Sequence, residues 1–420
     1  MLKKRFTLGI ALALLTPLAA CSSNGEGSTE NEQPTEPLQF YLSGDTSQGG
    51  GYAKMAEQYA EETGVEVEVV DIAYADLPVK IKNAAQADDL PALARMPAID
   101  PVWMEQLADL SEIGEKHNVM MDLAPITDDG RALSLPSDVT AVGLFLNTTL
   151  WDEAGETWPT SADDVWTWDE YVAATKRVQE ATGAKYGMVM DRSSHRLKSF
   201  LFQFGSELWL PDENGDYVTN DATKPALEYF KTLNDDSFMP RSVWLSSDDP
   251  AALFKSGNVA SYYSGSWQIA SFEAEIADFE WVSVRMPAQP VRATQYGNAA
   301  EMVVFEDTGQ TEAALDFVDW LYTPENYTQL MEYSSMLPAA NEITPEYSSN
   351  QEAFELYNEE IAVSPDIVGE IKQNDFKLAV AGKTTEGDPL RDETIKYLND
   401  EVTIDEALAN ISDLLNEGLK

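Results

Sequence analysis

Apolar and polar residues follow two recurring patterns along this chain, and together they predict its class of fold. Residues 38–42 form a short apolar run, and Tyr52, Met55 and Tyr59 then recur at helical spacing. Residues 65–69 alternate valine with glutamate, as a strand with one buried face does. A strand, a helix and a strand in succession are the unit of a parallel sheet flanked by helices. We therefore expect an α/β fold.

Polar loops follow several of the expected strands. Residues 43–48 follow the first apolar run, residues 97–103 follow the run at 90–96, and residues 191–195 follow the run at 186–190. Ligands of parallel sheets bind at the carboxyl ends of the strands. The loops therefore supply candidate ligand-binding residues, which are Ser43, Asp45, Asp100, Trp103, Arg192 and His195.

The segment 254–267, FKSGNVASYYSGSW, combines a helix end, a strand and an aromatic ring. Gly257 is placed to end a helix, and residues 259–263 are apolar and aromatic, as in a buried strand. Gly265 then allows a close approach of the backbone, with the flat ring of Trp267 beside it. We expect this ring to face a ligand. The alternative is a core tryptophan at a strand end.

Composition narrows the possible functions. The 420 residues, 44% of them hydrophobic, are enough for two domains. The chain has 73 acidic and 27 basic residues, a net charge of -46, which excludes binding of nucleic acid and disfavours direct docking on anionic lipids. An acidic, solvated surface explains this charge, and a cationic ligand is the alternative. One cysteine permits no intrachain disulfide, and two histidines permit no multi-histidine metal site. We expect neither metal nor cofactor.

The N-terminus has the pattern of an exported protein. Basic residues 3–5 precede an apolar stretch at 8–18, which ends in Leu-Ala-Ala-Cys at Cys21. This ending resembles the lipobox of bacterial lipoproteins. The resemblance implies that residues 1–20 are a signal peptide and that Cys21 is diacylated, giving an extracytoplasmic protein anchored to the cell membrane. Residues 22–37 lack any large apolar residue, and residues 21–37 are expected to be a disordered tether.

Six segments, in order, resemble the sugar-type extracellular solute-binding proteins of bacterial ABC importers. They are LPSDVTAVGLFLNTTLWDEAG (135–155), TWDEYVAATKRVQEATG (167–183), FLFQFGSEL (200–208), LFKSGNVASYYSGSW (253–267), TEAALDFVDWLYTPENYTQLM (311–331) and SSMLPAANE (334–342). The chain departs from the family at Leu146, where tyrosine is common, and at Pro91-Ala92, where Pro-Asp is usual.

The resemblance implies a two-lobed periplasmic-binding-protein-like fold. Each lobe would be a mostly parallel sheet flanked by helices, and crossing hinge strands would join the lobes. The first lobe would hold residues 38–140 and 298–342, and the second 141–297 and 343–420. A ligand bound between the lobes would close them and be delivered to the transmembrane subunits of an ABC permease. We expect the protein to be a monomer.

A carbohydrate ligand agrees with the residue types at the predicted loop ends. A sugar offers an apolar C–H face to flat rings and a rim of hydroxyl groups to polar side chains. The candidate rings are Trp103, Trp209, Trp244, Trp267 and Tyr263. The candidate polar partners are Ser43, Asp45, Asp100, Asp138, Arg192, His195 and Asn298. For each tryptophan other than Trp267, a place in the core remains an equal alternative.

No catalytic motif stands out. The chain has no G-x-S-x-G, P-loop, HExxH or Cys-x-x-Cys sequence, so we expect a binding protein rather than an enzyme. With so many carboxylates a surface glycoside-active enzyme remains an alternative, and so does a binder of a cationic non-sugar solute. The adjacent Tyr262 and Tyr263 resemble tyrosine pairs that bind ferric iron, but on a strand they point to opposite faces.

Overall fold

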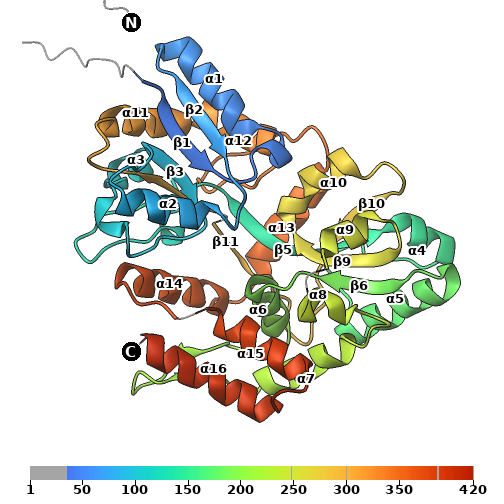
Figure 1. Ribbon diagram of the computed structural model, residues 1–420. Coiled ribbons are helices and arrows are strands. Elements are labelled where there is room, and N and C mark those ends of the chain that lie inside the picture. The colour runs from blue at the N-terminus through green and yellow to red at the C-terminus, as the bar shows by residue number, and fades with distance from the viewer. Residues whose placement is uncertain (1–35, 247, 299, 386, 420) are drawn as a thin grey trace, which may run out of the picture. The chain divides into compact units, whose positions relative to one another are not determined.

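The computed structural model describes residues 36–419, apart from Ser247, Ala299, Glu386 and the side chain of Asn298. The expected signal peptide, Cys21 and all but the end of the expected tether lie outside the described residues. The described chain forms two separate five-stranded sheets, each with helices packed on it, and one short two-stranded sheet (Figure 1).

The first sheet has five strands in the order β2-β1-β3-β12-β4. Its strands are β1 (Leu38–Leu42), β2 (Val67–Asp71), β3 (Leu93–Met96), β4 (Leu135–Pro136) and β12 (Glu301–Val304). Strand β1 pairs in parallel with β2 and β3, as the strand-helix-strand pattern predicted. Strand β12 is antiparallel to both β3 and β4. The sheet is therefore parallel on one side and antiparallel on the other.

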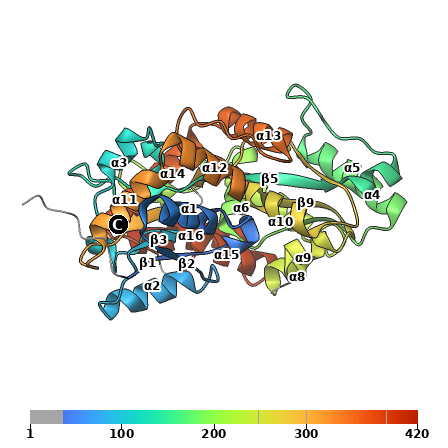
Figure 2. The same cartoon turned by 90° about the horizontal axis from the view of Figure 1, so that it is seen from above.

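Helices cover this sheet on both faces. They are η1 (Thr46–Gln48), α1 (Gly51–Thr63), α2 (Leu77–Gln86), η2 (Met104–Gln106), α3 (Ser111–Lys116), η3 (Met121–Leu123), α11 (Thr311–Leu321) and α12 (Pro324–Ser334). Tyr52, Met55 and Tyr59 of α1 are buried, as their spacing predicted. Helix α1 lies beside α12, although the two are far apart in the sequence (Figure 2).

The second sheet has the order β10-β5-β9-β6, and β11 pairs with the start of β5. Its strands are β5 (Val139–Asn147), β6 (Tyr186–Met190), β9 (Val259–Gly265), β10 (Trp281–Val284) and β11 (Tyr296–Asn298). Only β6 and β9 run in parallel, so the expectation of a mostly parallel second sheet is wrong. The reason is that β5 enters from the first sheet and runs against its neighbours β9, β10 and β11.

The second sheet carries the remaining helices and a short hairpin, β7 (Leu210–Pro211) with β8 (Tyr217–Val218). The helices are α4 (Thr148–Ala154), α5 (Trp168–Thr182), α6 (Ser194–Gln203), α7 (Thr223–Leu233), α8 (Arg241–Leu245), α9 (Pro250–Lys255), η4 (Ser266–Gln268), α10 (Ile269–Glu275), α13 (Gln351–Val363), α14 (Ile367–Val380), α15 (Pro389–Leu398) and α16 (Ile404–Leu419). The predicted capping box of Thr167 and Glu170 is present at the start of α5.

Two of the passages between the sheets are made by strands at neighbouring places, and the chain crosses again between α12 and α13. Strands β4 and β5 belong to different sheets, yet only Ser137 and Asp138 separate them. Strands β11 and β12 also belong to different sheets and follow each other closely. Val139, at the start of β5, also bridges to Leu337. The predicted crossing strands are thus present, and the two-lobed fold is confirmed; the assignment of each residue range to a lobe stays a prediction.

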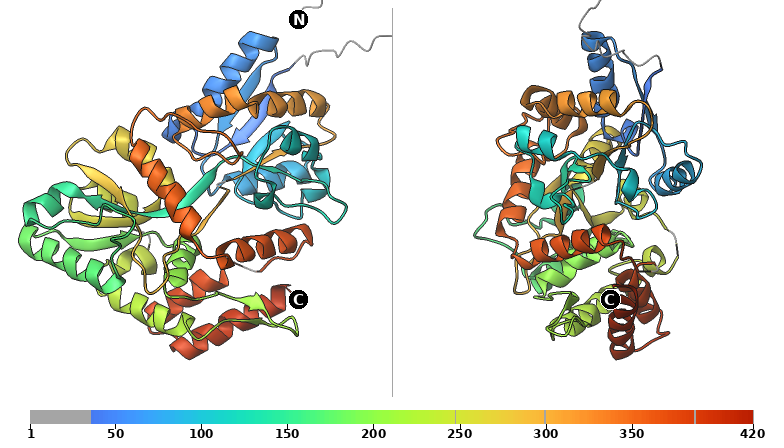
Figure 3. Two further views of the ribbon diagram at one scale, coloured as in Figure 1. Left: turned by 180° about the vertical axis from the view of Figure 1, so that it is seen from behind. Right: turned by 90° about the vertical axis from the view of Figure 1, so that its left-hand side faces the viewer.

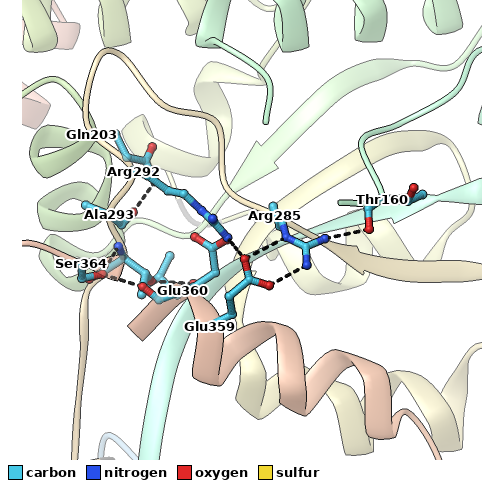
Figure 4. A network of polar contacts seen from close by, with 10 residues as sticks. Thr160, Gln203, Arg285, Arg292, Ala293, Glu359, Glu360 and Ser364 are labelled. Carbon is cyan, nitrogen blue, oxygen red and sulfur yellow. Dashed lines mark hydrogen bonds and ion pairs between the residues drawn. The ribbon is translucent and has the colours of Figure 1, made fainter. Parts of the chain in front are cut away.

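Helix α13 runs along β5 and is tied to the segment that follows β10 by an arginine-carboxylate network (Figures 3 and 4). The Glu359 carboxylate accepts hydrogen bonds from Arg285 at 2.5 Å and from Arg292 at 2.7 Å. Arg292 also contacts the buried Glu360 at 2.6 Å. The two guanidinium groups lower the pKa of Glu359 to about 2. The Glu359 carboxylate is therefore ionised at neutral pH, and in this form it stabilises the packing of α13.

Candidate ligand-binding site

Strands β6 and β9 are parallel neighbours, so their carboxyl ends meet at one edge of the second sheet. Met190 is paired with Tyr263, which places Asp191 next to the end of β9. The Asp191 carboxylate accepts hydrogen bonds from the Tyr262 hydroxyl at 2.7 Å and from Ser264 Oγ at 3.0 Å. It also forms an ion pair with Arg196 of α6 at 2.9 Å. One carboxylate thus fixes the two strand ends and the following helix together.

Trp267 lies at this edge and is held from two sides. The guanidinium carbon of Arg196 is 4.3 Å from the centroid of the indole ring, a cation-π contact. A Cβ atom on Gly265 would lie 2.1 Å from Cζ3 of the same ring, so only glycine leaves it room. The close backbone approach predicted at Gly265 is confirmed, and its immediate partner is the ring itself. Trp267 remains half-buried, with part of its surface open.

His195 stands beside Trp267 at the start of α6, with 5.9 Å between the ring centroids. The helix start is capped by Ser193, whose Oγ accepts a hydrogen bond from the His195 backbone N–H at 3.2 Å. Burial lowers the pKa of His195 well below its ordinary value, and the nearby cations Arg196, Lys372 and Lys198 lower it further. The imidazole is therefore neutral at pH 7 and can both donate and accept a hydrogen bond.

A cavity of about 480 Å³ opens on another side of α6. Ser194 and Lys198 of α6 line it, while Ala98 and Ile99 reach it from the loop after β3 of the first sheet. The rest of the lining comes from Leu208, Trp209, Tyr217, helix α14 and residues between Lys383 and the end of α16. Its volume is in the range of small-molecule sites. Residues that follow strands of both sheets therefore line one cavity, and α6 connects it with the Trp267 edge.

The loop after β1 comes close to the same edge, because η1 lies beside α10, the helix that follows Trp267. Ser43 is half-buried at the start of this loop. Asp45 is 5% exposed, and its carboxylate accepts hydrogen bonds from the backbone N–H groups of Tyr52 at 2.8 Å and Ala53 at 3.1 Å. Asp45 is thus engaged in holding the first turn of α1.

Three of the five predicted rings have no free face in this structure. Trp103 is 1% exposed and packs edge-on against Phe305, and Trp244 is fully buried against Phe230. Tyr263 is fully buried in the core of the second sheet. Trp103 and Trp244 therefore lie in the core, which was the alternative to ligand binding for these two residues. Trp209 is largely buried and donates its indole N–H to Ser412 at 3.0 Å, but it lines the cavity.

The remaining predicted polar residues are scattered. Asp138 is fully buried and forms an ion pair with Arg95 at 2.7 Å. Asp100 accepts a hydrogen bond from the backbone N–H of Val102 at 2.8 Å, and the exposed Arg192 donates to the carbonyl of Ser246 at 2.7 Å. The backbone of Asn298 pairs with Val139, and its side chain lies outside the described residues.

Sequence reasoning missed three charged residues of this region. Asp191 and Arg196 lie on either side of the predicted His195 in the sequence. Their position in the same loop and helix start could have identified them as part of the site. Lys372 of α14 is also electrostatically coupled to His195, but the two lie far apart in the sequence and nothing in their spacing connects them.

Two features are absent from the described residues. Across 36–419, with the gaps named above, no group of three or more histidine, cysteine or acidic side chains is arranged to hold a metal ion. In the same part of the chain, no helix has the length and apolar character needed to cross a membrane.

Comparison with known proteins places the chain among binding proteins. The family model described as bacterial extracellular solute-binding protein matches residues 54–355. A putative binding protein of Brucella abortus is 22% identical over 225 residues, 52% of this chain and 54% of that protein. The arabinooligosaccharide-binding protein of Bacillus subtilis is 28% identical over 172 residues, 40% of this chain and 38% of that protein. The matched region thus spans about half the length, or less, of these curated relatives.

Solved structures share the fold over almost the whole chain. The GacH receptor of Streptomyces glaucescens, solved without ligand and with acarbose, superposes with a TM-score of 0.74 at 21% identity, covering 91% of this chain and 98% of its own. The substrate-binding protein Lmo0181 of Listeria monocytogenes, solved with cycloalternan, gives a TM-score of 0.73 at 22% identity, with the same coverage of each chain. At this identity the likeness concerns the fold.

Proposed function

The chain belongs to the family of bacterial extracellular solute-binding proteins, and we propose that its solute is a carbohydrate, most simply an oligosaccharide. The observation that carries this proposal is the fixed, half-buried ring of Trp267 beside the neutral imidazole of His195. His195 belongs to α6, whose Ser194 and Lys198 also line a cavity of about 480 Å³. A flat ring suits the C–H face of a sugar, and a neutral imidazole suits its hydroxyl groups. The arabinooligosaccharide-binding relatives support the same class of ligand.

The proposed mechanism is closure of two lobes around the sugar. The neighbouring passages at β4-β5 and β11-β12 are the proposed hinge. A sugar that contacts Trp267 on one side and the loops after β1 and β3 on the other would bind the closed form better, and so shift the population toward it. The closed form would then dock on the transmembrane subunits of an ABC permease. We further propose that Cys21 carries the lipid anchor and that the protein is a monomer.

Isothermal titration calorimetry of the purified protein against a panel of oligosaccharides tests this function. We expect one class of oligosaccharide to bind with a dissociation constant near the micromolar range, which corresponds to about 8 kcal/mol. The bound sugar should be recovered intact after long incubation. Hydrolysis products would identify an enzyme instead, and a thermal shift with polyamines but with no sugar would identify a cationic solute.

A further inference from the structure

Lys372 is a cation without an ion-pair partner among the side chains that the structure describes. It lies half-buried on α14, with its Nζ 4.6 Å from the ring centroid of Phe376. A Cβ atom placed on Gly297 of β11 would be 3.5 Å from the same Nζ. The ammonium group therefore lies between α14 and the strand that leads from the second sheet to the first.

Other positive groups face the same region. Arg196 and Lys198 on α6 act together with Lys372 on the imidazole of His195. The α6 N-terminus, a ten-residue helix, adds the positive end of its dipole. Arg196 is neutralised by Asp191 at 2.9 Å, and Lys198 by Asp375 at 3.2 Å. Lys372 is thus the cation of this group that is left for another partner.

The carboxylates that act on Lys372 are already engaged elsewhere. They are Glu301 of β12 and Asp375 of α14. Glu301 accepts a hydrogen bond from Ser134 Oγ at 2.6 Å, and Asp375 pairs with Lys198. Burial lowers the pKa of Lys372, and this effect outweighs the opposite effect of Glu301 and Asp375. A partly desolvated ammonium gains more from an anion than from a neutral hydroxyl group.

We propose that the carbohydrate bound at this site is anionic, and that Lys372 receives its carboxylate or sulfate group while Trp267 contacts a sugar ring. The inference rests on the proposed function and narrows its ligand to uronate-containing or sulfated oligosaccharides. The surface of a protein with a net charge of -46 repels such ligands, so a local cation is needed to hold one.

Pairs of probes with one backbone and different charge test this inference. The affinities would be measured by calorimetry at about 0.15 M salt, where the Debye length is about 8 Å. The pairs are oligogalacturonides and their methyl esters, glucuronoxylo-oligosaccharides and neutral xylo-oligosaccharides, and sulfated and unsulfated galacto-oligosaccharides. In the pair that binds, the acidic member should bind about tenfold or more tightly. Lys372→Met should remove this difference, because the acidic member loses much more affinity than the neutral one.

Two further variants make the result specific. Lys377→Met removes one positive charge from an exposed position on the same helix and should keep the acidic preference. Lys372→Arg keeps the charge and should keep most of the preference. A wild-type protein that binds the neutral member as tightly as the acidic one overturns the inference but leaves carbohydrate binding in place. An acidic preference that survives in Lys372→Met overturns the role of Lys372, and failure to bind any oligosaccharide overturns the proposed function and this inference together.

Discussion

Gly265 and Trp267 fit against each other so closely that a Cβ atom on Gly265 would lie 2.1 Å from Cζ3 of the indole and 2.6 Å from the carbonyl oxygen of Ala141. Gly265→Ala must therefore displace the ring and strain the backbone contact. We expect the variant to lose at least tenfold in affinity for the sugar, and about 1–3 kcal/mol in free energy of unfolding. Calorimetry and urea denaturation measure the two effects.

Trp267→Ala separates the two parts of that effect. Because the ring is half-buried, its removal should cost about 1–3 kcal/mol in binding, a factor of roughly 5 to 150 in affinity, with a smaller loss of stability. Unchanged affinity in a folded Trp267→Ala protein would remove this ring from the site.

Trp244 of α8 provides the matched control, because it belongs to the same core cluster that Trp267 packs against but is fully buried, against Phe230. Trp244→Ala should lower the free energy of unfolding by about 3–5 kcal/mol through the cavity it leaves. The molecules that remain folded should bind the sugar with unaltered affinity. If the variant lost affinity for the sugar without losing free energy of unfolding, Trp244 would be a ligand-binding residue after all.

Asp138, between β4 and β5, and Arg95 of β3 form a buried ion pair, with side chains 0% and 8% exposed. Asp138→Ala would leave the guanidinium group of Arg95 buried without its counter-charge, so we expect a loss of about 3–5 kcal/mol in free energy of unfolding. The double variant Arg95→Met/Asp138→Leu should lose less, since no uncompensated charge remains. Chemical denaturation of the three proteins checks this order, and a double variant no more stable than Asp138→Ala would contradict it.

The lowered pKa of His195 makes a pH prediction with a definite sign. Below about pH 6.5, His195 is protonated in the unfolded chain but stays neutral in the folded chain. The free energy of unfolding therefore falls as the pH falls, until the pH reaches the lowered pKa of the folded state. Above pH 6.5 the residue contributes no pH dependence. The difference in stability between wild type and His195→Gln should therefore be constant above pH 7 and should turn against the wild type below pH 6.5. A flat difference between pH 7 and 5 would contradict the lowered pKa.

The Glu359 network should act in a lower range of pH. Its pKa of about 2, against an ordinary value of 4.5, means that its stabilising contribution is complete above pH 4.5 and is lost as the pH falls toward 2. At pH 7 we expect Glu359→Gln to be less stable by about 1–3 kcal/mol, because Arg285 and Arg292 lose a charged acceptor. Denaturation curves of the two proteins should converge near pH 2. A difference that stays constant down to pH 2 would show that Glu359 is not ionised through this range.

Local features of the fold were predictable because they depend on near neighbours in the sequence. The apolar spacing of α1, the capping box at Thr167 and the close approach at Gly265 each follow from a few adjacent residues. The same holds for the polar loop that contains His195, since a strand end and a helix start are both readable in the sequence.

Burial of single aromatic rings was not predictable, because it depends on distant segments. Trp103 follows the end of a strand, which is where a ligand-binding ring is expected. In the structure it is covered by Phe305, a residue that is distant in the sequence. Lys372 acts on the pKa of His195 for the same reason, because α14 lies near α6, as the ion pair of Asp375 with Lys198 shows. The antiparallel pairings of both sheets also escaped prediction, because periodicity gives the existence of a strand and not its direction.

The position of β12 inside the first sheet also affects how the protein is made. Strand β12 lies between β3 and β4, yet it is synthesised long after both. At about 5–20 residues per second, a ribosome needs roughly 10 to 40 s to reach Glu301 after Met96. Throughout that time β3 has an unpaired edge, which is prone to pair with other chains. Folding that begins only when the whole chain is available avoids this hazard, and export of the unfolded chain before it folds would provide that order.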